Sequence, residues 1–327
     1  MNTRNGLDGL RQIPAGSVVS IGNFDGIHLG HGRILATADG LRRTGANASG
    51  RVAVVTFEPH PLTVLRPGHA PPRLTPPGMK QQLLAAAGVD EYVVLPPVPE
   101  VLDLTAERFW HILRDEARVA HLVEGDSFTF GKGRGGTIDR LREWSAGGPV
   151  ALHVVPPVSV PLLDMQVVPV SSSLTRWLIG HGRVRDAAIC LGRPYALQGP
   201  VVKGHQRGRT IGIPTANLDC GEQLIPADGV YVGRCEVDGR AYPVALSIGT
   251  MPTFGRNARQ VEAHLIGYDG DLYGRALRVE VIDWLREQWR FSGVEALKAK
   301  MARDLDAVRE RAGLDPSEPI AAEVLSG

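Results

Sequence analysis

Short apolar runs alternate with amphipathic stretches through the first half of the chain. Runs typical of buried strands occupy residues 17–24, 51–57, 91–96, 120–125 and 150–156. Between them, apolar residues recur at helical spacing in residues 32–43, 79–88, 105–118 and 137–145. Strands that alternate with helices predict an α/β domain with a parallel sheet covered by helices on both faces.

The pattern changes after Leu191. Apolar runs with strand character then follow one another closely, with glycine turns between them, in residues 229–249 and 260–285. Each run predicts a hairpin, the first turning at residues 237–239 and the second around residues 269–271. Such closely spaced strands predict a small antiparallel β-barrel.

Helical patterns stand before and after the predicted barrel. Residues 171–192 predict two short helices, broken at Gly180–Gly182. Residues 293–313 carry apolar side chains at every third or fourth position, which predicts an amphipathic helix packed on the barrel. The change of pattern places the domain boundary between residues 185 and 186, giving domains 1–185 and 186–327.

Composition narrows the class of protein. The 327 residues are 43% hydrophobic and 22% charged, with a net charge of +1. This balance gives no electrostatic footprint for nucleic acid or for a membrane surface. No apolar run is long enough to span a bilayer, the first residues lack the apolar core of a signal peptide, and three scattered cysteines form no disulfide framework. A cytoplasmic protein is expected; the oligomeric state is not indicated.

The stretch IGNFDGIHLGHGR, residues 21–33, follows the first predicted strand and opens a helix. A helix N-terminus at the carboxyl end of a parallel strand suits phosphate, and Gly30 leaves room for it. His28 and His31 are three residues apart, so both can donate to developing negative charge. Two alternatives are that the histidines only cap the helix, or that they bind zinc, although no third ligand follows at suitable spacing.

Two further motifs point to the same edge. TFEPHP, residues 56–61, ends the second predicted strand. SSSLTR, residues 171–176, opens a helix with hydroxyl side chains, and Arg176 is placed to reach a polyphosphate. By contrast, the glycine-rich residues 131–136 satisfy G-x-G-x-x-G, but the next strand ends in prolines and not in the acid that a nicotinamide site needs.

The second half has its own candidate site. Residues 199–217 contain Gly204, Gly208 and Gly212 among basic side chains, a pattern that suits phosphate or, alternatively, a series of β-turns. Thr215 and Asn217 then present two oxygens on one strand face, which suits Mg²⁺. Glu262 alternates with apolar neighbours and is either a functional or a surface carboxylate.

Taken together, GNFDGIHLGH, TFEPHP, FTFGKGRGG, SSSLTR, PTAN, VEAHL and DLYG resemble the prokaryotic bifunctional riboflavin kinase/FAD synthetase family over nearly the whole chain. The resemblance implies phosphorylation of riboflavin to FMN and adenylylation of FMN to FAD, both with ATP and Mg²⁺. In the first half it implies His28, His31 and Arg176 as catalytic groups, Gly22, Asn23, Asp25, Gly30 and Ser172 on the nucleotide, and Phe57, His60, Pro61 and Phe128 on the flavin.

In the second half the resemblance implies Glu262 as the base, Gly204, Gly208 and Gly212 on ATP, Thr215 and Asn217 on the metal, and Arg286 near the flavin. Ser127, Val170 and Thr175 depart from the family pattern, which leaves riboflavin kinase activity with weak or lost FAD synthesis as an alternative. A tRNA-binding synthetase fragment would need a lysine-rich second signature and a basic face, which the sequence lacks. A non-catalytic flavin carrier is the remaining alternative.

Overall fold

The computed structural model describes residues 1–44, 50–204, 213–250, 259–289 and 291–313. The chain forms two compact units, one of residues Met1–Pro71 and Pro77–Ser159, the other of Pro72–Pro76 and Val160–Gly327. The predicted boundary of the two functional domains, at residue 185, stays a prediction.

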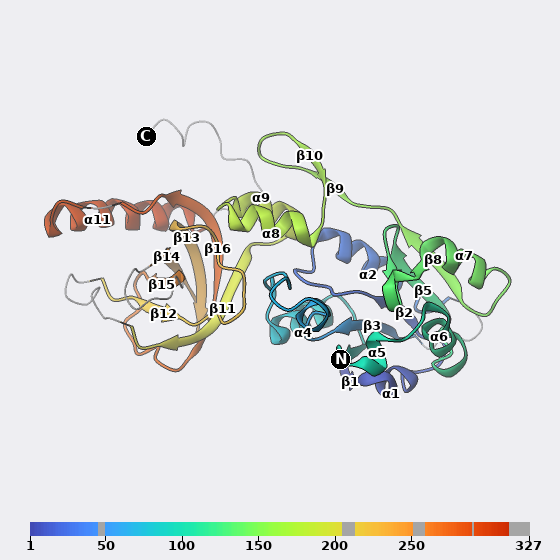
Figure 1. Cartoon of the computed structure of the whole chain (residues 1–327). Coiled ribbons are helices and arrows are strands. Elements are labelled where there is room, and N and C mark those ends of the chain that lie inside the picture. Colours follow the sequence, from blue (N-terminus) through green and yellow to red (C-terminus); the bar gives the residue numbers. More distant parts are fainter. Residues whose placement is uncertain (45–49, 205–212, 251–258, 290, 314–327) are drawn as a thin grey trace. The chain divides into compact units, whose positions relative to one another are not determined.

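The first unit contains a six-stranded parallel sheet, as predicted (Figure 1). Its strand order is β1-β4-β3-β2-β5-β8. The strands are β1 (Asn2–Asn5), β2 (Val18–Ile21), β3 (Val52–Phe57), β4 (Glu91–Leu95), β5 (His121–Gly125) and β8 (Ala151–Val155). All except β1 were predicted. After β2 the chain adds β3 and β4 on one side and later β5 and β8 on the other, so the order reverses between β2 and β5.

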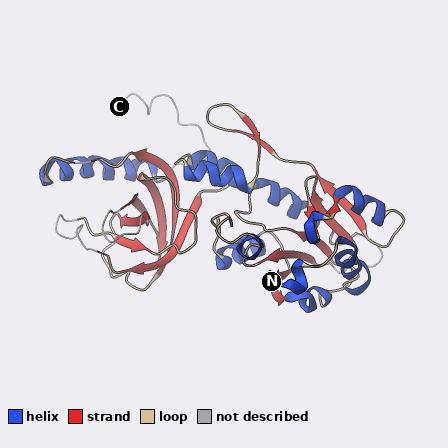
Figure 2. Cartoon of the chain, viewed as in Figure 1, coloured by secondary structure: helices blue, strands red, loops and turns tan. Residues whose placement is uncertain are grey.

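Helices cover both faces of the sheet (Figure 2). Successive side chains of β2 point to opposite faces of the sheet. Val19 and Ile21 therefore pack in one apolar cluster, and Val18 packs in the other. The first cluster is completed by α1 (Gly6–Arg11), α6 (Ala106–His111), which continues as a π-helical turn over Ile112–Glu116, and α7 (Ile138–Ser145). The second is completed by α2 (Leu29–Leu41) and α4 (Pro77–Ala86).

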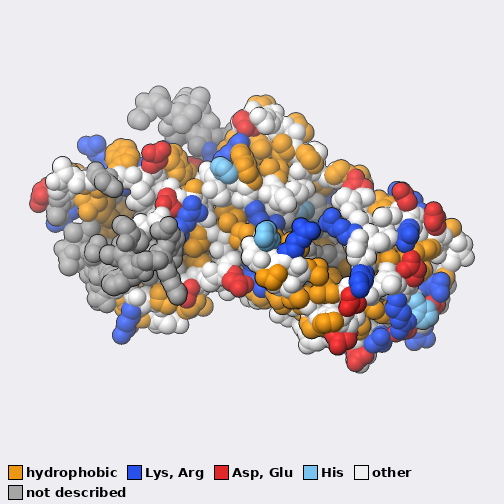
Figure 3. All heavy atoms as spheres, viewed as in Figure 1, with side chains coloured by type: hydrophobic (Ala, Val, Ile, Leu, Met, Phe, Trp, Pro, Cys, Tyr) orange, Lys and Arg blue, Asp and Glu red, His pale blue; other side chains and the backbone are white. Residues whose placement is uncertain are grey.

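Short elements complete the first half. They are α3 (Leu62–Leu65), α5 (Pro99–Leu102), the 3₁₀ turn Lys132–Arg134, the pair β6 (Thr129–Phe130) and β7 (Gly136–Thr137), and the pair β9 (Ser159–Pro161) and β10 (Val167–Pro169). On the face that Figure 3 shows, basic and acidic side chains are interspersed over the first unit. None of the helices in the described part of the chain is long and apolar enough to cross a bilayer.

The second unit contains a closed barrel with strand order β11-β12-β15-β14-β13-β16. The strands are β11 (Tyr195–Val202), β12 (Ala216–Leu218), β13 (Gly229–Val237), β14 (Arg240–Thr250), β15 (Arg259–Leu265) and β16 (Ala276–Arg286). The predicted hairpin of β13 and β14 is confirmed. Asp238 and Gly239 form its turn at φ values of 51° and 76°, the left-handed pair that suits the twist of a hairpin.

The second predicted hairpin is wrong. β15 pairs with β12 and β14, whereas β16 pairs with β11 and β13. Both sides of β15 are therefore occupied, and the turn around residues 269–271 carries the chain across the barrel instead of back along β15. Barrel closure decides this pairing, because a closed sheet leaves no unpaired edge.

Within the described residues of the second half, three helices accompany the barrel. α8 (Ser172–Gly180) and α9 (Val184–Leu191) are separated where predicted, with Gly182 at a φ of 74°. α11 (Val294–Arg311) packs on the barrel as predicted, because Val308 is fully buried among residues that include Val232 and Ile282.

A short segment from the first half of the sequence belongs to the second unit. Arg73 forms a parallel bridge with Gln223. The buried side-chain amide of Gln223 donates to the backbone carbonyls of Leu74, at 3.1 Å, and Ala196, at 2.7 Å. These bonds anchor residues 72–76 on the barrel.

Two candidate active sites

The loop between β2 and α2 has an unusual backbone. Phe24, Gly26 and Ile27 have φ values of 45°, 84° and 42°. Non-glycine residues rarely adopt this left-handed region, and such strain is typical of functional sites, where surrounding contacts hold it in place. The loop is therefore fixed at the carboxyl edge of the sheet.

His28 is the N-cap of α2. Its Nδ1 accepts the backbone N–H of His31 at 3.3 Å, and the two rings stack with centroids 3.8 Å apart. Since Nδ1 is the acceptor, the neutral ring carries its proton on Nε2. The cap therefore orients His28 as a donor for an anion, so capping and phosphate binding are compatible.

The TFEPHP motif meets this loop, as predicted. Thr56 donates through its hydroxyl to the carbonyl of Asn23 at 3.2 Å. The side-chain amide of Asn23 lies 3.2 Å from Nε2 of His60, whose Nδ1 accepts the N–H of Leu62. The atom of Asn23 in this contact is Nδ2, so the loop after β2 touches the TFEPHP motif directly.

A buried ion pair supports the same motif. Lys80 on α4 lies 3.4 Å from the carboxylate of Glu58, and both side chains are largely buried. This ion pair ties α4 to the segment that follows β3. Asp25, in the loop after β2, is also buried.

The remaining candidates of the first half lie in known surroundings, but their roles stay predictions. Phe57 and Phe128 border the apolar cluster on the α6 and α7 face, where Phe128 stacks on Phe130 with centroids 5.5 Å apart. Pro61 is the N-cap of α3. Ser172 and Arg176 lie on α8, in the second compact unit, so their approach to a nucleotide at His28 stays a prediction.

The barrel brings Asn217 and Glu262 together. They are directly opposed on the antiparallel strands β12 and β15, and Ser247 on β14 is opposed to Glu262 on its other side. Their neighbours Ala216, Leu218, Val261 and Ala263 are buried, whereas these three polar residues are half-buried. Because side chains alternate along a strand, the three share the outer face of the barrel.

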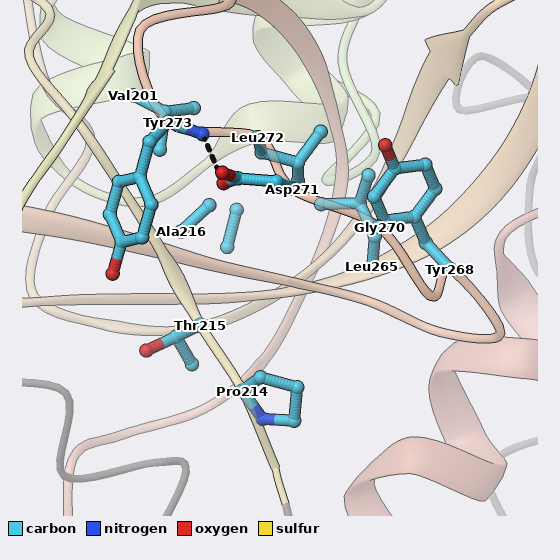
Figure 4. A pocket seen from close by; sticks show the side chains of 11 residues that line it. Val201, Pro214, Thr215, Ala216, Leu265, Tyr268, Gly270, Asp271, Leu272 and Tyr273 are labelled. Carbon is cyan, nitrogen blue, oxygen red and sulfur yellow. Dashed lines mark hydrogen bonds between the residues drawn. The ribbon is translucent and has the colours of Figure 1, made fainter.

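Thr215, just before β12, lines a pocket together with the buried strand residues Ala216 and Ala263 (Figure 4). Tyr268 and Tyr273 also line the pocket, and Asp271 accepts the N–H of Tyr273 at 2.9 Å. The segment before β12 is held by His264, whose Nδ1 lies 2.7 Å from the carbonyl of Pro214. Of the two predicted metal ligands, Thr215 lines the pocket and Asn217 does not.

Gly204 packs directly against Asn217, since a Cβ at that position would overlap the Asn217 side chain. The glycine thus permits a close approach to a predicted metal ligand. Gly208 and Gly212 lie outside the described residues.

Arg286 has a structural partner that the sequence did not reveal. Its guanidinium lies 2.7 Å from the carboxylate of Asp304 on α11; Asp304 is buried and Arg286 is largely buried. Lys300 approaches the same carboxylate at 3.2 Å, and the ring of Trp289 lies 5.4 Å from Arg286. The predicted contact of Arg286 with flavin stays a prediction.

A parallel sheet with His-x-Gly-His at its reversal point, followed by a closed antiparallel barrel, defines a two-domain nucleotide-dependent transferase. The FAD synthetase family model matches residues 10–173 and the riboflavin kinase model matches residues 191–312. The chain belongs to the bifunctional riboflavin kinase/FMN adenylyltransferase family.

Relatives cover nearly the whole chain. The bifunctional riboflavin kinase/FMN adenylyltransferase of Escherichia coli K12 is 37% identical over 319 residues, which are 96% of this chain and 99% of the relative. The Bacillus subtilis enzyme of the same name is 31% identical over 300 residues, 90% of this chain and 92% of the relative. A solved structure titled macrolide-efflux protein from Streptococcus pneumoniae has a TM-score of 0.85 at 29% identity, covering 95% of this chain and all of that one.

Replacing Asp304 by asparagine should loosen α11. The substitution leaves the Arg286 charge buried without its carboxylate, which costs about 3–5 kcal/mol. Amide hydrogen exchange of α11 should then accelerate by roughly 100-fold or more. Asp306→Asn is the matched control, because its ion pair with Arg309 is exposed. Equal exchange in the two variants would contradict the structural role of the Arg286 pair.

Proposed function

We propose that the His28 loop carries out the adenylyl transfer of this bifunctional enzyme and that the Glu262 row carries out its phosphoryl transfer. The enzyme phosphorylates riboflavin to FMN and adenylylates FMN to FAD. The observation that supports separate roles is the direct opposition of Glu262 and Asn217 on the barrel, while the His-x-Gly-His and TFEPHP motifs meet on the sheet.

At the sheet, the FMN phosphate attacks the α-phosphorus of ATP and pyrophosphate leaves. The nucleophile is already an anion, so no base is needed and catalysis rests on positioning and charge stabilisation. His28, oriented by its cap, donates from Nε2 to the phosphates, and the N-terminus of α2 adds its partial positive charge. Asn23 and Asp25 hold the nucleotide side of the loop, and His31 adds a second imidazole to the anion site.

At the barrel, the terminal ribityl hydroxyl of riboflavin attacks the γ-phosphorus of ATP. Glu262 accepts the hydroxyl proton as the O–P bond forms, and ADP leaves. The Thr215 hydroxyl and the Asn217 carbonyl are hard oxygens beside this carboxylate, a donor set that fits Mg²⁺ bound to ATP phosphates. When bound, the metal would neutralise phosphate charge. The adjoining pocket, with Tyr268 and Tyr273, receives the nucleotide.

The kinase-only alternative rests on Ser127, Val170 and Thr175. Val170 and Thr175 are buried, and the Thr175 hydroxyl donates to the carbonyl of Ser171 at 2.9 Å. Both residues therefore pack α8 and do not offer side chains to a ligand. Ser127 lies in an exposed turn. The structural roles of Val170 and Thr175 and the exposed position of Ser127 favour an enzyme with both activities over the kinase-only alternative.

His28→Asn should lower kcat/KM for FAD formation from FMN and ATP by about 10²–10³. Asparagine preserves the N-cap acceptor but lacks the Nε2 donor. Chromatography of the products measures this, and FMN formation by the same preparation is the internal control. His69→Asn, at an exposed site, should behave as wild type. FAD formation that survives at the wild-type rate would refute the role of His28.

Glu262→Gln should lower kcat for FMN formation by about 10²–10⁴, because the amide cannot accept the hydroxyl proton. Its size keeps the row on the barrel intact, so riboflavin should still bind. Product chromatography measures the rate, and quenching of flavin fluorescence measures binding. Adenylylation of supplied FMN should continue. If kcat for FMN formation is unchanged in Glu262→Gln, the enzyme uses another base. If wild type binds riboflavin but forms no FMN, and Glu262→Gln binds it equally well, the carrier alternative is favoured.

A further inference from the structure

The sheet of the first unit parts at its carboxyl edge between β2 and β5. The last residues that these strands pair are Val19 and Leu122. On its other side, β2 remains paired with β3 as far as Ile21, and β5 remains paired with β8 as far as Gly125. The parting coincides with the reversal of strand order, where open α/β sheets bind ligands in the crevice beyond the strand ends.

The side chain of Glu124 bridges this parting. Its Oε1 accepts the backbone N–H of Ile21 at 2.8 Å. In a continued ladder, a backbone carbonyl of β5 would accept from that part of β2. Glu124 is only 2% exposed, so the bridge is built into the interior. Ile21 directly precedes the loop that ends at His28, and the bridge therefore fixes the starting point of that loop.

We propose that Glu124 is a positioning residue of the adenylyl-transfer site, which through Ile21 holds the loop of Asn23 and His28 in place for ATP. The inference rests on the proposed function of that loop. Nothing in the sequence singled out this residue, since an acid near the end of a strand usually lies on the surface. Ser127, where the resemblance leads one to expect an acid, is exposed, whereas the buried acid of this region is Glu124.

Burial of this carboxyl group favours its neutral form. Burial raises the pKa of Glu124 well above its ordinary value, and only the hydrogen bond from Ile21 opposes this. Next to β5, β2 carries no titratable side chain, β8 carries His153, and α2 on one face carries His31, Arg33 and Asp39. On the other face, which Glu124 shares with Leu122, the titratable side chains of α6 and α7 are Glu107, Arg108, His111, Asp139, Arg140, Arg142 and Glu143. None of them contributes to the shift.

The preference of Glu124 for its neutral form has a functional consequence. A negative charge beneath the loop would repel the triphosphate of ATP and would draw water into the parting. The pKa of Glu124 is higher in the folded state than in the unfolded state. The contribution of the neutral acid to the stability of the fold is therefore fully present at pH values below the unfolded-state pKa. That stabilisation is lost as the pH rises through the raised value. Affinity for ATP at this site should fall over the same range.

The test compares wild type with Glu124→Gln and Glu124→Leu in FAD formation from FMN and ATP, from about pH 5 to about pH 9. Glutamine keeps a carbonyl acceptor for Ile21 but cannot ionise. It should retain kcat/KM within about twofold at neutral pH and should lose the alkaline rise in KM for ATP. Leucine leaves the Ile21 N–H without its acceptor, and kcat/KM should fall by about 10–100-fold while FMN formation stays unchanged.

The outcomes separate the hypotheses. Wild-type kcat/KM in Glu124→Leu, or an unchanged alkaline rise of KM in Glu124→Gln, would overturn the role of Glu124. If Glu124→Leu does not fold, the pH dependence of KM for ATP in Glu124→Gln, compared with that of wild type, still tests the role of Glu124. A wild-type enzyme that forms FMN but no FAD would instead overturn the proposed function of the loop, and this inference with it. Glu143→Gln, an exposed acid on α7, is the matched control and should follow wild type throughout.

Discussion

Burial of the central sheet on both faces is the constraint on which the first unit depends. Alternate residues of the strands enter the two apolar clusters, so both faces of the sheet are covered. Polar side chains that could bind a ligand are therefore expected in the loops where the strands end. The loops after β2 and β3 meet at that edge through Asn23 and His60. In the barrel the buried residues face the interior, and Asn217, Ser247 and Glu262 lie on the outer face. Two packing constraints thus give one chain two differently built candidate sites.

Local pattern predicted most of the architecture. Five of the six parallel strands follow from apolar runs, because buried parallel strands are continuously apolar. β1 was missed, since its sequence Asn-Thr-Arg-Asn has no such run and is placed by pairing with β4. The pairing of β16 was predicted wrongly for a related reason. Which edge a strand joins depends on closure of the whole barrel, and the turn at residues 269–271 cannot encode it.

The candidate sites were predictable only where their residues belong to sequence motifs. The meeting of the His28 loop with TFEPHP and the pairing of Asn217 with Glu262 agree with expectations drawn from spacing and resemblance. Asp304 and Glu124 were not predictable, because each acts on a partner far away in sequence, Arg286 or Ile21, and neither belongs to a motif. Such contacts form only when the folded chain brings the buried acid and its partner together, so a local sequence pattern does not predict them.

The anchoring of residues 72–76 on the barrel bears on any attempt to divide the gene. A fragment that starts after the parallel sheet would deprive the Gln223 amide of its acceptor on Leu74, at a cost of about 1–3 kcal/mol for a buried donor. The barrel is thus completed by a peptide encoded more than a hundred codons upstream. A split version of the enzyme would work best if that peptide were supplied in trans, or grafted ahead of β11 by a linker.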